Sequence, residues 1–258
     1  MEGLEQQALD LQRDRLATLG TLSAGLAHEI NNPLSYVLAN LRFLSREIID
    51  LKRQLDEGAK PLKNTESLLL ECAQVLSESI EGVQQIGKLV KDMKRFARSD
   101  ESQGEWFELQ EILESSLRII GHELKHRVSI EKQFERVLPC LWGSPARIQQ
   151  VFINLLMNAA QAIDLPPGEL GRVEIGLSRK AGGILAVVKD NGTGIPPEHM
   201  GKLFDPFFTT KAFENGTGLG LFICKELIVQ HGGYLHLEST PGEGTQAHVW
   251  LPVKDKTD

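Results

Sequence analysis

The sequence predicts two domains of different fold class, a helical hairpin followed by an α/β sandwich. Two observations lead to this prediction. Residues 19–98 repeat their apolar side chains at helical spacing. A polar stretch at 99–104 then interrupts the pattern, and beyond it short β-type runs alternate with helical segments, as they do in α/β proteins.

The first domain is expected to consist of two long antiparallel helices, one over 5–56 and the other ending near residue 98. From Leu34 onward the apolar spacing alternates three and four, which is typical of helices packed in a coiled-coil-like bundle. A glycine and a proline within 56–61 supply the break, and the short connection folds the chain back. A lone hairpin cannot bury two apolar seams well, so we expect two copies to pair as a homodimer with a four-helix bundle. The apolar positions are Leu19, Leu22, Leu26, Ile30, Leu34, Val37, Leu41, Leu44, Ile48, Leu51 and Leu55 in the first helix, and Leu69, Leu76, Val83, Val90 and Ala97 in the second.

One titratable residue of the first helix points away from this apolar line. At 3.6 residues per turn, His28 lies about 200° around the helix from both Leu26 and Ile30, so we expect its ring to be exposed. A histidine with a purely structural role is not expected at such an exposed position. A neutral imidazole nitrogen is a competent nucleophile near pH 7. Asn32 lies about 40° from His28 on the same face, one turn along. Pro33 cannot donate to the helix ladder, and we interpret it as a hinge beside the histidine.

The second domain is expected to interleave strands with helices. β-type residues gather in five short runs, and helical periodicity appears between them. This alternation is typical of an α/β sandwich. The expected strands are 128–130, 173–175, 184–188, 234–237 and 247–250, and the expected helices are 109–124, 145–163 and 218–231.

Composition narrows the class of protein. The chain has 258 residues, 41% of them hydrophobic and 24% charged, which is ordinary for a soluble globular protein. A net charge of −7 argues against a nucleic-acid partner. Three separated cysteines outside any CxxC pattern fit reduced thiols in a cytosol and give no hint of zinc. No run approaches the roughly 20 apolar residues of a membrane helix, and the polar N-terminus is unlike a signal peptide, so we expect no membrane contact by this segment.

Two polar motifs of the second domain are candidates for a nucleotide site. Asn154 and Asn158 are four residues apart on one helix face, where an amide oxygen could ligate magnesium. A polar helix face accounts for them equally well. Asp190 ends an apolar strand before Gly192 and Gly194, so its carboxylate could accept a hydrogen bond from an adenine amino group while the glycines let backbone approach the base. A tight turn would account for that motif alone.

A third motif, Gly216-Thr217-Gly218-Leu219-Gly220-Leu221, runs straight into a helical pattern. Glycines that open a helix expose backbone N–H groups at its positive end, where phosphates bind. The residues before the motif are not a strand, which argues against a Rossmann site. No Gly-Lys-Ser/Thr follows, so the motif is not a Walker loop.

These motifs, together with Phe204-Asp205-Pro206-Phe207-Phe208-Thr209-Thr210-Lys211, occur in a fixed order between residues 154 and 221. The arrangement resembles the ATP-binding domain shared by sensor histidine kinases, gyrase-type topoisomerases, Hsp90 and MutL. The amino-acid sequences of the segment 204–211 and of the glycine motif 216–221 resemble those of the histidine kinase branch. The segment His28-Glu29-Ile30-Asn31-Asn32-Pro33-Leu34 is similar to the phosphoacceptor box of that family.

The resemblance implies that the second domain is an α/β sandwich of the GHKL (Bergerat) ATPase type with ATP and Mg2+ as ligands. It assigns the metal to Asn158 and the adenine to Asp190, which Thr245 supports. It also implies a mobile lid over 192–217, anchored by Phe207 and Phe208, and a phosphate side shaped by Asn154 with Arg147 near it on the helix. A solvated lid lysine would account for Lys211 nearly as well as a phosphate contact. The other implied nucleotide contacts are Gly192, Gly194, Gly216, Thr217, Gly218, Leu219 and Gly220.

For the first domain, the resemblance implies that ATP phosphorylates His28 and that the phosphoryl group passes to an aspartate on the receiver domain of a response regulator. Glu29 would fix the tautomer of the imidazole and take up the developing proton. Asn32, in a Glu-x-x-Asn pattern, would orient the water that dephosphorylates the regulator. An ordinary polar residue before a proline is the alternative for Asn32.

The expected domains are a signalling-helix remnant at 1–18, a dimerisation and phosphoacceptor domain at 19–100, and a catalytic ATP-binding domain at 105–254. We expect a cytoplasmic protein, or the cytosolic portion of a larger membrane-anchored sensor. Two other classes stay open: an ATPase of the same superfamily that drives a conformational clamp, and a scaffold that only binds regulators or nucleotides. The exposed histidine argues against the clamp, and the intact Asn158, Asp190 and glycine motif argue against the scaffold.

Overall fold

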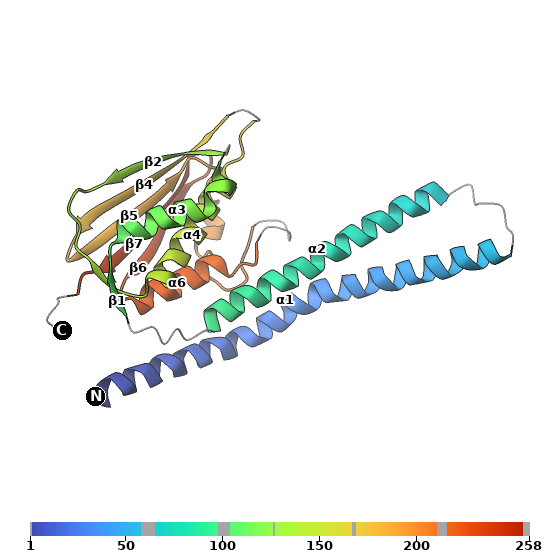
Figure 1. Ribbon diagram of the computed structural model, residues 1–258, viewed down its shortest axis with the longest axis horizontal. Helices are drawn as coiled ribbons and strands as arrows, with labels where there is room; N and C mark the ends of the chain where they lie inside the picture. Colours follow the sequence, from blue (N-terminus) through green and yellow to red (C-terminus); the bar gives the residue numbers. More distant parts are fainter. Residues whose placement is uncertain are drawn as a thin grey trace. The chain divides into compact units, whose positions relative to one another are not determined.

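The computed structural model describes residues 2–57, 65–97, 104–125, 127–166, 169–210 and 216–254 (Figure 1). The chain divides into two compact units, residues 1–99 with 209–217, and residues 100–208 with 218–258. The first contains a helical hairpin and the second a mixed five-stranded sheet with helices, so the predicted fold class is confirmed. Within the described ranges, no helix combines the length and the apolar character that a membrane crossing requires.

The hairpin consists of α1 (Glu2–Asp56) and α2 (Thr65–Ala97), which lie side by side and run antiparallel (Figure 1). These bounds confirm the two long helices that the apolar spacing predicts. The glycine–proline break expected between them falls largely within 58–64, outside the described residues.

Small and apolar side chains fill the contact between α1 and α2, and Asn40 Nδ2 donates a hydrogen bond across it to the Val75 carbonyl oxygen at 3.3 Å. Val37 and Leu89 are buried, and Ser79 is buried as well. A Cβ at Gly82 would lie 2.7 Å from both Tyr36 Oη and Val37 Cγ2, so the two helices approach closely at this point. The buried and half-buried positions of α2 form a series spaced three and four apart, with Gln85 half-buried beside it; the series is Leu68, Cys72, Val75, Ser79, Gly82, Ile86, Leu89 and Met93.

The apolar line that the sequence predicts for α2 lies outside this contact. α1 carries a matching outward line, and in both helices its members are seven residues apart. Each of these side chains is about half exposed or more, from 49% at Leu34, Leu76 and Val90 to 70% at Leu55. The two exposed lines are Leu34, Leu41, Ile48 and Leu55 on α1, and Leu69, Leu76, Val83 and Val90 on α2.

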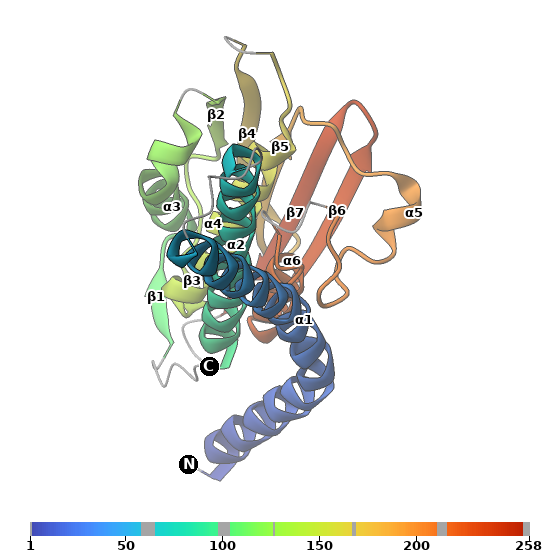
Figure 2. The same cartoon turned by 90° about the vertical axis from the view of Figure 1, so that its right-hand side faces the viewer.

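α1 continues through Pro33 without a break. The Pro33 side chain is buried, and the Ser35 hydroxyl donates a 2.7 Å hydrogen bond to the carbonyl oxygen of Asn31. A proline removes one bond of the helix ladder, and a hydroxyl bonded to the carbonyl four residues back often bends a helix. Figure 2 shows that α1 changes direction within its N-terminal half. The hinge expected at Pro33 stays a prediction.

The second unit is built on a sheet with the strand order β2-β4-β5-β7-β6 (Figure 1). β2 is parallel to β4, and the other neighbours are antiparallel. Each strand contains one of the five β-type runs that the sequence predicts. Their bounds are β2 Val128–Phe134, β4 Gly171–Lys180, β5 Gly183–Asp190, β6 Tyr234–Thr240 and β7 Gly244–Pro252.

Three helices, α3 (Leu109–Leu124), α4 (Pro145–Ala162) and α6 (Gly220–Gln230), cover one face of this sheet (Figure 1). Alternate side chains of each strand point into the layer between the sheet and these helices, because side chains of a strand alternate between the two faces of the sheet. The buried side chains of this core include Phe152, Val173, Ile175, Leu177, Ile184, Ala186, Val188, Leu235, Leu237, Val249 and Leu251.

Three short elements are absent from the sequence prediction. β1 (Glu105–Phe107) and β3 (Leu141–Gly143) pair as a separate antiparallel sheet, and α5 (Pro197–Met200) is a single turn. In the small sheet Trp106 and Trp142 are cross-strand partners with ring centroids 5.3 Å apart. Segments of three or four residues are too short to show a period, so hydrophobic spacing could not reveal them.

Candidate nucleotide-binding and phosphoacceptor sites

Asp190 is the last residue of β5 and a buried carboxylate, 5% exposed. Like the buried Val188 two residues before it, it points to the helix-covered face. Its Oδ1 accepts hydrogen bonds from the backbone N–H groups of Gly192 at 2.8 Å and Thr245 at 3.2 Å. Burial raises the pKa of Asp190, and the two hydrogen bonds offset part of that rise. Oδ2 accepts no hydrogen bond from the described residues, so the carboxylate keeps one oxygen for a ligand.

The turn after β5 packs closely on neighbouring backbone. A Cβ at Gly192 would lie 2.5 Å from the carbonyl oxygen of Ala162 at the end of α4, and Gly194 has a φ of +70°. Thr193 donates its N–H to the Ala162 carbonyl at 2.9 Å and accepts the N–H of Gly242 at 2.8 Å. The two glycines expected near the base are therefore required by the backbone, and the turn is fixed to both α4 and the β6–β7 connection.

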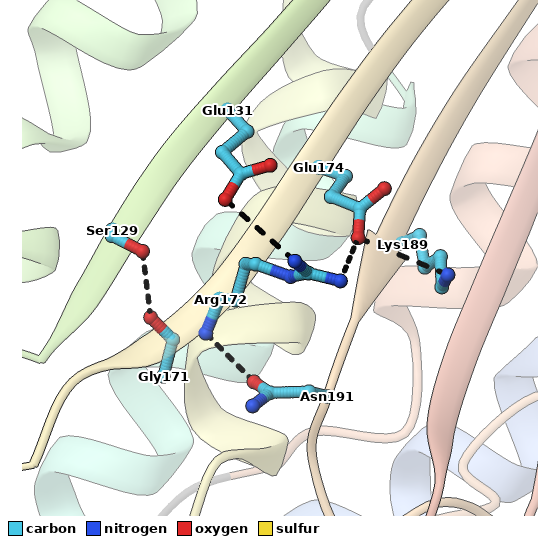
Figure 3. A network of polar contacts seen from close by, with 7 residues as sticks. All are labelled: Ser129, Glu131, Gly171, Arg172, Glu174, Lys189 and Asn191. Atoms are coloured by element: carbon cyan, nitrogen blue, oxygen red, sulfur yellow. Dashed lines mark hydrogen bonds and ion pairs between the residues drawn. The ribbon is translucent and has the colours of Figure 1, made fainter.

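Asn191 fastens the start of this turn to β4 (Figure 3). Its Oδ1 accepts the N–H of Arg172 at 2.7 Å, and its own N–H donates to the Arg172 carbonyl at 3.2 Å. The Arg172 guanidinium pairs with Glu174 at 2.6 Å and lies 3.8 Å from Glu131, while Lys189 lies 3.8 Å from Glu174. Exposed ion pairs add little stability, so the end of β5 is held mainly by the two hydrogen bonds between Asn191 and the Arg172 backbone.

Ser239 joins three segments around Asp190, and the sequence predictions missed it. Ser239 on β6 and Thr245 on β7 are cross-strand partners, with hydroxyl oxygens 2.9 Å apart. The Ser239 hydroxyl also accepts the N–H of Ile195 and donates to the carbonyl of Gly244, each at 2.8 Å. Thr245, expected to support Asp190, contacts it through its backbone N–H. Only the strand register, and no local motif, could have revealed Ser239.

The asparagine face of α4 meets the beginning of α6. Asn154 and Asn158 are both half-buried on α4. Asn154 Nδ2 donates to Cys224 Sγ on α6 at 3.7 Å, and it would lie 4.0 Å from a Cβ at Gly220, the first residue of α6. Burial raises the pKa of the Cys224 thiol to about 12, so this cysteine stays protonated and unreactive.

Arg147 does not belong to this end of the helix pair. Its Nη1 donates to Gln230 Oε1 at 3.0 Å, at the opposite end of α6 from the glycine motif. Seven residues of α4 separate it from Asn154, which corresponds to roughly 10 Å along the helix axis. A place for Arg147 near the phosphate side stays a prediction, and its contact with Gln230 lies about two helical turns from Asn154.

The glycine motif leads into α6, which begins at Gly220, two residues later than the sequence predicts. Gly218 has a φ of +65°, and a Cβ there would collide with the backbone of Phe207. Phe207 donates its N–H to the Gly218 carbonyl at 3.0 Å and has a φ of +67°, which is uncommon for a bulky residue. Together these contacts join the two ends of the segment between Phe207 and Gly218. Lys211 lies outside the described residues.

The remaining expected residues are placed as follows. Phe208 is half-buried, with its ring centroid 5.6 Å from that of His199. Gly216 and Thr217 are half-buried and Leu219 is buried. In the hairpin unit His28 and Asn32 are exposed and Glu29 is half-exposed, which confirms the outward orientation predicted for His28.

The described residues contain no group of three His, Cys, Asp or Glu side chains able to hold a metal ion. Mg2+ is normally bound by one or two protein oxygens, several waters and the phosphates of the substrate. A single amide oxygen from Asn158, one turn from Asn154, fits a site of that kind.

Two family models match the chain. The model described as histidine kinase-, DNA gyrase B- and HSP90-like ATPase matches residues 143–255. The model described as the His kinase A (phospho-acceptor) domain matches residues 18–102. The two matched segments contain the nucleotide motifs and His28, respectively.

Curated relatives and solved structures agree with these matches. A putative sensor protein of Shewanella frigidimarina is 32% identical over 96% of this chain and 39% of its own length. The sensor histidine kinase ZraS of Escherichia coli is 30% identical over 94% of this chain and 47% of its own length. The chain thus spans less than half of these two relatives.

Among solved structures, the catalytic domain of histidine kinase ThkA is 30% identical with a TM-score of 0.51 and covers 58% of this chain and 97% of that one. A structure of ThkA in complex with the response regulator protein TrrA is 25% identical with a TM-score of 0.65, covering 98% of this chain and 67% of that one.

Proposed function

Because this chain belongs to the sensor histidine kinases of two-component systems, we propose that it transfers the terminal phosphoryl group of ATP to His28. The observation that carries the proposal is Asp190, a buried carboxylate whose Oδ1 is held by two backbone N–H groups while Oδ2 is left for a ligand. An ionised carboxylate is acceptor-only, so Oδ2 suits the amino group of adenine. The matched ATPase model supports ATP as the nucleotide.

The phosphates would lie where the asparagine face of α4 meets the N-terminus of α6. The glycine motif from Gly216 to Gly220 opens that helix, and N–H groups at a helix N-terminus attract anions. Asn158 would supply one oxygen ligand to Mg2+, and the triphosphate and water would supply the others. Magnesium neutralises negative charge on the transferred group, and phosphoryl transfer is catalysed mainly by such charge neutralisation together with alignment of the reactants.

His28 would act as the attacking nucleophile. Its exposed ring is accessible to a phosphate donor, and a neutral imidazole nitrogen carries a lone pair that can attack phosphorus. One ring nitrogen forms the new bond to phosphorus while the bond to the ADP oxygen breaks, and the proton of the other nitrogen becomes acidic. Glu29, the next residue, would hydrogen-bond that nitrogen, fix the tautomer and take up the proton.

The exposed heptad lines of the hairpin support a homodimer. Eight large apolar side chains at strict seven-residue spacing would remain in water in a single copy. Two hairpins that pack along these lines would bury them in a four-helix bundle with coiled-coil-like packing. The paired helices of 19–100 would then form the dimerisation and phosphoacceptor domain, with 105–254 as the ATP-binding domain and 1–18 as the signalling helix.

The partner that receives the phosphoryl group would be an aspartate on a response-regulator receiver domain. The similar ThkA is a kinase solved in complex with a response regulator protein, and it covers 98% of this chain. Asn32 is exposed on α1 one turn beyond His28, where its amide could orient a water that attacks the phosphorylated regulator. We therefore propose phosphatase activity toward the same regulator.

Labelling with γ-phosphate-labelled ATP tests the kinase proposal. We expect acid-labile, base-stable label on the protein, lost in His28→Gln while ATP binding is retained. His122→Gln, which changes an exposed histidine of α3, is the matched control and should label like the wild type. Label that persists in His28→Gln would refute the assignment. ATP hydrolysis without labelled protein would indicate a clamp ATPase, and binding without turnover would indicate a scaffold.

A further inference from the structure

We propose that Ser239 is a positioning residue that sets purine selectivity, because it holds the Thr245 hydroxyl in a state that cannot donate a hydrogen bond to a base. This inference rests on the proposed binding of ATP at Asp190. Ser239 lies outside all four nucleotide motifs, and its hydroxyl belongs to a small hydrogen-bond network in which each proton can be assigned to one bond.

The Ser239 hydroxyl has one proton and two lone pairs. A carbonyl can only accept, so the 2.8 Å bond to the Gly244 carbonyl uses the single Ser239 proton. A backbone N–H can only donate, so the 2.8 Å bond from Ile195 uses one lone pair. The remaining contact, 2.9 Å from Thr245 Oγ1, must then be a hydrogen bond that Thr245 donates to Ser239. The proton and both lone pairs of the Ser239 hydroxyl are therefore all used in hydrogen bonds.

Thr245 therefore presents lone pairs but no proton to its surroundings. Its neighbours Ala247 and Val249, two and four residues on, point into the helix-covered layer, so Thr245 points there as well. Asp190 ends β5 on that same face, and its Oδ1 accepts the Thr245 N–H. The wall formed by these two residues offers acceptors only: the free carboxylate oxygen and the threonine oxygen.

An acceptor-only wall distinguishes purines by the group at position 6. Adenine has an amino group there, which donates two hydrogens. Hypoxanthine and guanine have a carbonyl oxygen, which faces the wall as acceptor against acceptor. A freely rotating threonine hydroxyl could turn its proton toward that oxygen and relieve the mismatch, but Ser239 withholds the proton. Leaving a buried polar group unpaired is costly, so the restraint favours adenine.

Binding of ATP and of inosine triphosphate, measured by titration calorimetry, tests the inference. The two ligands differ at position 6, where the second has an oxygen. In Ser239→Ala the Thr245 proton is released, and we expect the ratio of the inosine triphosphate Kd to the ATP Kd to fall three- to tenfold, the effect of about one net hydrogen bond. Ser239→Thr, which keeps the hydroxyl, should restore the wild-type ratio. An unchanged ratio in Ser239→Ala would overturn the inference.

The Thr245→Val background separates a proton effect from a loosened turn, because valine has a similar shape and no hydroxyl. There, Ser239→Ala should change the ratio less than twofold, since no proton remains to be released. An equal fall in both backgrounds would show that Ser239 acts by holding the turn, which contradicts the proposal.

Two further outcomes are distinguishable. If Ser239→Ala does not fold, Thr245→Val alone decides, because valine removes an oxygen that can only accept. Its Kd for inosine triphosphate should rise less than threefold or fall, and a threefold or larger rise would refute the restraint on the proton. If the wild-type chain binds neither nucleotide, the proposed ATP site fails, whereas ATP binding with an unaltered ratio in Ser239→Ala refutes only the role of Ser239.

Discussion

Replacing Asp190 with asparagine should separate nucleotide binding from the stability of the free protein. The amide oxygen of asparagine can still accept the N–H groups of Gly192 and Thr245 that hold the side chain. The other carboxylate oxygen becomes an –NH2 group, which presents donors to an adenine amino group that is itself a donor. A hydrogen bond to a charged group contributes about 1.5–3 kcal/mol, and a loss near the upper end weakens ATP binding about 100-fold.

The same substitution should stabilise the protein without ATP. Burial raises the pKa of Asp190, so the ionised carboxylate is less favourable in the folded than in the unfolded chain. A carboxyl group with a raised pKa costs nothing at a pH below its unfolded pKa, and the cost grows as the pH rises and is complete above the folded pKa. Asparagine is neutral and removes that cost at pH 7, and the stability difference between variant and wild type should shrink as the pH falls.

Thermal unfolding with and without ATP measures both effects. ATP at about 100 times its Kd stabilises the wild type by about 2.7 kcal/mol, and a 100-fold weaker Kd leaves about 0.4 kcal/mol at the same concentration. Asp190→Asn should therefore unfold at a higher temperature than wild type without ATP and show almost no ATP-dependent shift. Asp56→Asn, at the exposed end of α1, is the control and should keep the full shift. A full ATP shift in Asp190→Asn would refute the adenine assignment, and a lower melting temperature without ATP would refute the burial argument.

Further predictions concern the backbone, the dimer and the regulator. Gly244→Ala should destabilise the ATP-binding unit by more than the roughly 1–3 kcal/mol of backbone strain, because φ is +105° and the new Cβ would collide with the Asp190 carbonyl. Gly242→Ala, with φ +81° and no atom within 4 Å, should show the backbone strain alone. Equal free energies of unfolding for the two variants would contradict this prediction. Ile48→Glu, on the exposed heptad line, should be a monomer by light scattering. The control variant Lys52→Glu, at another exposed position of α1, should stay dimeric. A dimeric Ile48→Glu would count against the proposed interface. Asn32→Ala should keep autophosphorylation but slow dephosphorylation of the regulator at least about tenfold. The control variant Asn31→Ala, at the neighbouring exposed position, should keep both activities. Equal dephosphorylation rates in the two variants would show that Asn32 does not orient the attacking water.

The periodicity of the apolar residues predicts the long elements well. α3 has the bounds that the sequence predicts, and the exposure of His28 follows from its angle to Leu26 and Ile30. Hydrophobic spacing fails where the packing residues are not hydrophobic. The contact between α1 and α2 passes through Ser79 and Gly82, which carry no apolar signal although they are buried.

The candidate site divides in a similar way. Asp190 and its glycines follow one another in the chain, so a local motif reveals them. Ser239 is 49 residues away from Asp190 and reaches it only through the pairing of β6 with β7, which no sequence pattern specifies. Arg147 shares α4 with Asn154 but contacts Gln230 at the other end of α6, which only the packing of the two helices reveals.

The proposed kinase activity requires that the terminal phosphoryl group of ATP moves onto His28. Mass spectrometry at neutral pH, after incubation with Mg2+ and ATP and digestion without acid, tests it most directly. We expect a phosphorylated peptide whose fragments place the phosphoryl group on His28, and a much lower yield of that peptide from Asp190→Asn at an ATP concentration near the wild-type Kd. A phosphoryl group on any other residue, or ADP formation with an unmodified His28, would rule out His28 as the phosphoacceptor.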